Sequence, residues 1–74
     1  MKLYFEDVNE TSRLIAECHT EEEIMQAITN FIENCNKHKP KNKQFKSRYI
    51  RTWEDNGKKW YDVGSHSEFF WRKI

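Results

Sequence analysis

The dipeptide Asn56-Gly57 constrains the fold of this 74-residue chain more than any other feature. It separates two segments rich in aromatic and β-branched residues, 49–53 and 60–63. A two-residue type I′ turn needs positive φ at both central positions, and Asn-Gly adopts it with little strain, so the pattern predicts a β-hairpin. Counting outward from the turn gives four predicted pairs: Trp53 with Trp60, Thr52 with Tyr61, Arg51 with Asp62, and Ile50 with Val63.

The predicted hairpin has two unlike faces, because side chains alternate between the faces of a strand. One face carries residues suited to a core: Ile50, Thr52, Tyr61 and Val63. The other mixes large rings with charge: Tyr49, Arg51, Trp53, Trp60 and Asp62. A domain this small buries only about 60% of its unfolded surface, so burying both faces is difficult. The second face is therefore a candidate partner-binding surface.

The first half of the chain predicts two paired strands and then a helix. Segments 2–8 and 12–18 alternate apolar with polar residues, and Leu14, Ala16 and Cys18 are expected on one face; a helix beginning near Arg13 is the alternative. Thr20 and Glu23 fit a capping box at a helix start, and Glu21 and Glu22 suit its first turn. Apolar residues then recur at helical spacing: Ile24, Ile28, Phe31 and Cys35, with Met25 and Ile32 beside them.

These elements predict one α+β domain. The helix is expected from Glu21 to Cys35 or Asn36, with Ile28 and Phe31 buried against the sheet. Residues 68–74 are expected to be extended, either continuing the fourth strand past a bulge or packing across a sheet edge. The expected order is ββαββ, an antiparallel sheet of about four strands with the helix on one face. The helical crossover is expected to bring the two hairpins side by side.

Charge is distributed unevenly, although the net charge is +1. Residues 1–36 contain eight acids and two bases, whereas residues 37–51 contain seven bases and no acid. No segment is apolar enough to span a membrane, and the first residues lack the pattern of a secretory signal. A cytoplasmic protein with no membrane partner is expected, in which Cys18 and Cys35 are reduced thiols.

The residues that carry chemistry do not form a pattern typical of an enzyme. Cys18, His19, Cys35 and His38 lack the spacing of a structural zinc site, and the two cysteines fit a core better. Neither cysteine lies on a glycine-rich elbow or a helix N-terminus that would activate it. With only Gly57 and Gly64, the chain has no phosphate-binding loop. We expect no catalytic residue, no metal and no cofactor.

Two binding functions remain. The basic residues Lys39, Lys41 and Lys43 precede the rings of the hairpin, and cations beside rings are typical of proteins that bind single-stranded nucleic acid. The near-neutral total charge argues against that function, and a solvated loop is the alternative for these lysines. Trp, Tyr and Arg are also the residues enriched at protein interfaces. For the mixed face, the alternatives are homodimerisation or burial under segment 69–71.

Two segments carry a resemblance to small proteins encoded by phages and prophages of low-GC Gram-positive bacteria. They are the run from Trp60 through Gly64-Ser65 to Phe70, and Leu14–Cys18 leading into Thr20–Glu23. Val63 departs from the aromatic residue expected before the glycine. The resemblance implies a viral protein that acts in the host cytoplasm by binding and inhibiting a host machine, such as a CRISPR nuclease or another defence enzyme.

The sequence thus predicts a non-enzymatic protein that binds a host protein, with single-stranded nucleic-acid binding as the alternative. The residues predicted to contact the partner are Tyr49, Arg51, Trp53, Trp60, Asp62, Lys39, Lys41 and Lys43.

Overall fold

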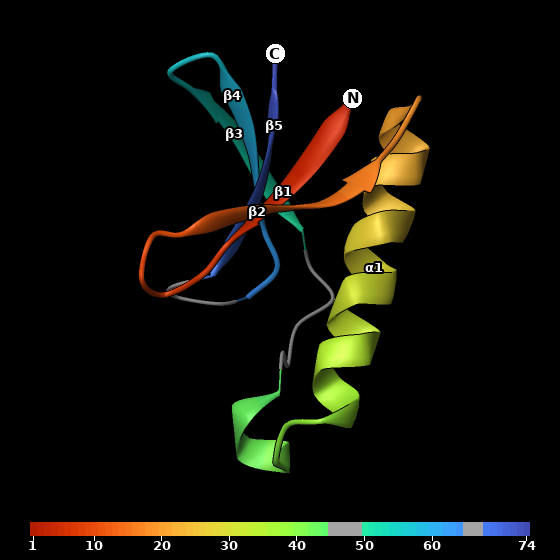
Figure 1. Cartoon of the computed structure of the whole chain (residues 1–74), viewed down its shortest axis with the longest axis vertical. Helices are drawn as coiled ribbons and strands as arrows, with labels where there is room; N and C mark the ends of the chain where they lie inside the picture. The colour runs from red at the N-terminus through yellow and green to blue at the C-terminus, as the bar shows by residue number, and fades with distance from the viewer. Residues whose placement is uncertain (45–49, 65–67) are drawn as a thin grey trace.

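The computed structural model describes residues 1–44, 50–64 and 68–74, with the side chain of Lys43 excepted. It confirms an α+β fold, in which one α-helix of the described residues lies across one face of an antiparallel sheet (Figure 1). In chain order the elements are β1 (Lys2–Glu6), β2 (Ser12–Glu17), α1 (Glu21–Lys37), the 3-10 helix η1 (Lys41–Lys43), β3 (Arg51–Asp55), β4 (Lys58–Asp62) and β5 (Phe69–Lys73).

In the described residues the sheet has five strands in the order β2-β1-β5-β4-β3. The expected ββαββ order with about four strands is therefore wrong, because a further strand, β5, follows the second hairpin. Strand β5 pairs with β1 on one side and with β4 on the other. The two hairpins are therefore not side by side, because β5 lies between them. The physical reason is that β5 is apolar on both faces, which suits the centre of a sheet: Phe70 is fully buried, while Phe69 and Trp71 are half-buried on the opposite face.

The β3–β4 hairpin has the predicted turn and register. Asn56 and Gly57 have φ of 53° and 72°, and Trp53 lies opposite Trp60. Tyr61 and Val63 are buried as expected, and Ile50 packs against the core. Thr52 lies opposite Tyr61 as predicted, but the expectation that it belongs to the core is wrong. It is exposed, because β3 is an edge strand whose five residues are all exposed.

A bulge in the β1–β2 pair changes the predicted faces. Leu3 lies opposite Ala16, but Tyr4 lies opposite Leu14, so Ile15 is an extra residue and the alternation of β2 shifts. Ala16 and the buried Cys18 pack with the core. Leu14 instead lies opposite Tyr4 and is 51% exposed, which corrects the expectation that these three residues share one face.

Helix α1 covers the sheet with Ile24, Ile28 and Ile32, all buried. Its N-cap is Thr20, whose Oγ1 accepts a hydrogen bond from the amide of Glu23 at 3.2 Å, as the capping box predicts. Phe31 is half-buried rather than buried and packs against the rings of Phe5 and Phe70, with centroids 4.6 and 5.6 Å away. No helix in the described segments is long and apolar enough to cross a membrane.

Candidate partner-binding face

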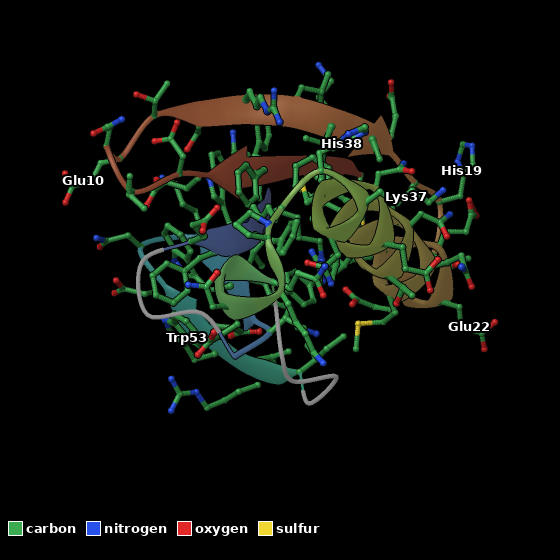
Figure 2. The ribbon with its side chains drawn as sticks, turned by 90° about the horizontal axis from the view of Figure 1, so that it is seen from below. Glu10, His19, Glu22, Lys37, His38 and Trp53 are labelled. Carbon is green, nitrogen blue, oxygen red and sulfur yellow. The ribbon has the colours of Figure 1, made fainter. Side chains whose placement is uncertain are left out.

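Four aromatic side chains form a continuous row on the sheet face opposite α1. Each comes from a different strand: Tyr4 from β1, Trp71 from β5, Trp60 from β4 and Trp53 from β3. The sheet register places them directly opposite one another, since Tyr4 pairs with Trp71, Trp71 with Trp60, and Trp60 with Trp53. In Figure 2, Trp53 lies on the side of the sheet away from α1. We call these four residues the ring row.

The rings of the row contact one another closely. Tyr4 and Trp71 are stacked, with centroids 4.3 Å apart and planes 15° from parallel. The centroids of Trp71 and Trp60 are 6.2 Å apart, as are those of Trp60 and Trp53. Phe69 stands edge-on to both Trp53 and Trp60. These contacts hold the rings in one arrangement, and Trp53, at the end of the row, is the most exposed of the four at 37%.

The faces of Trp71 are both occupied. Tyr4 stacks on one face, and the ammonium of Lys58 lies 4.2 Å from the ring centroid on the side of β4. The indole N–H of Trp71 donates to the hydroxyl of Ser12 at 2.9 Å. Trp71 can therefore present an edge, but not a free face, to a partner.

An ion pair lies beside the exposed end of the row. The Arg51 guanidinium donates to Asp62 Oδ2 at 2.9 Å and lies 5.8 Å from the ring centroid of Trp53. Asp62 is buried, and its Oδ1 also accepts from the amide of Gly64 at 3.1 Å. Asp62 therefore positions Arg51, whose side chain is 64% exposed and accessible to a partner.

The structure brings together only part of the predicted contact set. Arg51, Trp53 and Trp60 are adjacent, with Asp62 beneath Arg51, whereas Tyr49 and the side chain of Lys43 lie outside the described residues. Lys41 is exposed on η1, which lies at the opposite end of the molecule from the β3–β4 turn (Figure 1).

Lys39 belongs to a different surface from the ring row. It pairs with Glu68 at 3.8 Å and lines an open hollow of about 450 Å³ beside the C-terminal part of α1. Arg13 and Phe31 line the same hollow, and the Arg13 guanidinium lies 5.5 Å from the Phe31 ring centroid. Lys39 and Lys41 are therefore not part of the ring row.

Tyr4 and Trp71 were not predicted as members of the face, nor was Phe69 predicted as a neighbour of Trp53 and Trp60. Tyr4 lies between the buried Leu3 and Phe5, so alternation alone assigns it to the other face. The same alternation assigns Trp71 to the face opposite α1, because Trp71 follows the buried Phe70. What the sequence did not show is that β5 lies between β1 and β4, and only that strand order joins the rings into a row.

The cysteines and histidines do not form a metal site in the described segments, where no group of three or more His, Cys, Asp or Glu residues is placed to bind an ion. Both cysteines are free thiols, and Cys18 is buried. Burial, together with the nearby Glu23 carboxylate, raises the pKa of Cys18, so its thiol is less reactive than an ordinary one.

Neither protein-family models nor curated proteins nor solved structures match this chain.

Proposed function

We propose that this chain is a non-enzymatic binding protein of the phage type that binds a host protein through the ring row and Arg51. Inhibition or modulation of that host protein is the proposed outcome, and the sequence resemblance favours a defence enzyme, such as a CRISPR nuclease, as the target. The observation that carries the binding function is the ring row itself: four contacting aromatic side chains on the sheet face away from α1.

The geometry of the rings favours a protein partner over nucleic acid. Proteins that bind single strands stack bases on free faces of aromatic rings. Trp71 has no free face, because Tyr4 and Lys58 cover both. Rings that present their edges form an apolar surface with polar atoms at its border, which suits the side chains of a protein.

The charges near the row support the same choice. Arg51 is paired with Asp62, the Lys58 ammonium lies over Trp71, and Glu6 lies in β1 on the same face. The described lysines of the basic loop lie elsewhere, so phosphates that followed them would not place bases on the rings. The face therefore combines rings with both signs of charge, as protein interfaces do.

The rings are also held in place before binding. Because neighbouring strands immobilise Trp60 and Trp71 on both sides, a partner does not have to order them. The conformational entropy lost on association is correspondingly small, which favours affinity. Trp53 and Arg51 are the exposed anchors at the accessible end of the row.

The test compares Trp53→Ala with wild type. A tagged chain captures partners from a lysate of a low-GC Gram-positive host, with and without nuclease, and affinity for the purified captured protein is then measured. Loss of an anchoring ring costs about 1–3 kcal/mol, so Trp53→Ala should weaken binding about 5- to 150-fold. Val8→Ala, at an exposed residue outside the row, is the control and should bind as wild type does.

Titration of indole fluorescence with single-stranded oligonucleotides at several salt concentrations tests the alternative. We expect no saturable quenching. Tight binding that weakens steeply with salt and is lost in Trp53→Ala would replace the proposal with nucleic-acid binding.

A further inference from the structure

Strand β3 forms one edge of the sheet. In segments 1–44, 50–64 and 68–74, no strand pairs with this edge, and all five residues of β3 are exposed. The opposite edge of the sheet, β2, carries the bulge at Ile15, a device that discourages pairing with another strand. The register of β3 with β4 runs without a shift, so β3 is a regular edge suited to pairing.

The hairpin register determines which backbone groups of β3 face outward. In a two-residue hairpin, the residues flanking the turn exchange hydrogen bonds, and the pattern then alternates along the strand. Asp55, Trp53 and Arg51 therefore direct their N–H and C=O groups toward β4. Thr52 and Glu54 direct theirs outward, two residues apart, at the spacing that another antiparallel strand requires.

We propose that two copies of this chain associate through their β3 edges, in an antiparallel pairing with a two-fold axis at Trp53. This register places Thr52 of one copy opposite Glu54 of the other, so the outward backbone groups bond to each other. It places Trp53 opposite Trp53 in a pair without backbone hydrogen bonds. In this pairing the outward N–H and C=O groups of Thr52 and Glu54 in both copies form hydrogen bonds.

The charges of β3 are complementary under the same symmetry. Arg51 of one copy, which also bonds to Asp62 of its own chain, lies opposite Asp55 of the other, and the axis repeats this pair. Because residues 51, 53 and 55 share a face, the two ion pairs flank the central Trp53 pair on the ring-row face. An interface in which one patch is complementary to itself is what a two-fold dimer requires, and this register of β3 meets that requirement.

The consequence for the binding face is direct. The ring rows of the two copies meet at Trp53, so four rings from each copy form one continuous row across a shared sheet. This inference does not depend on the proposed host partner, because the interface is the strand edge and a second copy is the ligand. Either proposal can fail while the other is correct.

Sedimentation equilibrium over micromolar to millimolar concentrations tests the dimer. Wild type should show a concentration-dependent monomer–dimer equilibrium. Thr52→Pro removes the outward N–H without removing a bond to β4, and should weaken the dimer by about 30-fold or more, because two symmetry-related hydrogen bonds are lost. Thr52→Val keeps the N–H and should dimerise as wild type does. Circular dichroism checks that both variants fold.

A disulfide trap tests the register in a Cys35→Ser background. A mixture of Thr52→Cys and Glu54→Cys chains should form a cross-linked heterodimer under mild oxidation, since opposed residues in a hydrogen-bonded pair lie about 5.5 Å apart at Cα. Each variant alone should cross-link far less, because neither residue lies opposite itself. This trap retains the N–H of residue 52, so it also decides the question if Thr52→Pro fails to fold.

Asp55→Asn tests the proposed ion pairs between Arg51 of one copy and Asp55 of the other. It should weaken the dimer about 2- to 30-fold at low salt and less at high salt. A wild type that is monomeric at all concentrations would overturn the inference. So would a folded Thr52→Pro variant that dimerises as wild type does, or equal cross-linking in the mixed and single variants.

Discussion

Glu21, the first residue of α1, connects the helix to three residues of the sheet. Its carboxylate accepts from the Tyr61 hydroxyl at 2.9 Å, pairs with the Arg72 guanidinium at 2.6 Å, and lies 3.6 Å from the Lys59 ammonium. Burial acts to raise the pKa of Glu21, but the hydrogen bonds from Tyr61 and Arg72 and the charges of Arg72 and Lys59 outweigh it, so the pKa is lowered. For Tyr61, burial and the Glu21 carboxylate raise the pKa to about 12.

The lowered pKa of Glu21 predicts a loss of stability in acid. The unfolded chain binds a proton at Glu21 more readily than the folded chain does, so the stabilisation is complete above the ordinary Glu pKa of 4.5 and is lost as pH falls through the folded value. Since the side chain is 42% exposed, solvent screens the interaction and Glu21→Gln should cost only about 1 kcal/mol at neutral pH. Urea unfolding at several pH values measures the difference.

The control for this prediction is Glu22→Gln, which changes an exposed acid in the same turn. The difference in unfolding free energy between wild type and Glu21→Gln should disappear in strongly acidic solution. The unfolding free energy of Glu22→Gln should stay close to that of wild type at every pH. If the free-energy difference for Glu21→Gln did not depend on pH, the ionised carboxylate would not be the source of the stability that Glu21 contributes.

Among the elements, the β3–β4 hairpin and α1 are those the sequence predicted best. Both are set by neighbouring residues: Asn56 and Gly57 determine the turn, while Thr20 and Glu23 set the helix start. Strand β5 was not recognised as a separate central strand, because its place depends on pairing with β1 at the far end of the chain. The bulge at Ile15 was missed because an alternating pattern does not show where one residue is skipped.

The turn residue Gly57 gives a prediction for the hairpin. At φ of +72°, a side chain is strained, yet a Cβ added there would meet no atom within 4 Å. Gly57→Ala should therefore cost about 1–2 kcal/mol from backbone strain alone. Asn56→Gly, which keeps positive φ accessible, should stay within about 0.5 kcal/mol of wild type. Denaturant midpoints measure both, and equal effects of the two variants would contradict the prediction.

The central position of β5 predicts that Phe70 matters more than the end of the same segment. Phe70 is fully buried and contacts Phe5 and Phe31, with centroids 5.2 and 5.6 Å away. Phe70→Ala should cost about 3–5 kcal/mol, most of the stability of a domain this small. Phe70→Leu should cost less and keep the fold measurable. Ile74→Ala, at a residue 61% exposed, is the control and should change stability little.

At the scale of the whole molecule, the candidate face shows what sequence patterns leave undetermined. The pairing of Trp53 with Trp60, and their position beside Arg51, followed from counting along one hairpin. Tyr4 and Trp71 join them only through the strand order. The described lysines were expected near the rings because they are close in sequence, but η1 and the end of α1 direct that segment to the other end of the molecule.

The pairing of β1 with β5 also determines when the chain can fold. The sheet cannot close until residues 69–73 are available, because β5 is the only strand that links the β1–β2 pair to the β3–β4 pair in the described structure. Until then the β1–β2 hairpin and α1 lack their core partners Phe70 and Tyr61, which lie in β5 and β4. The folding rate is therefore governed by closing the long loop between β1 and β5.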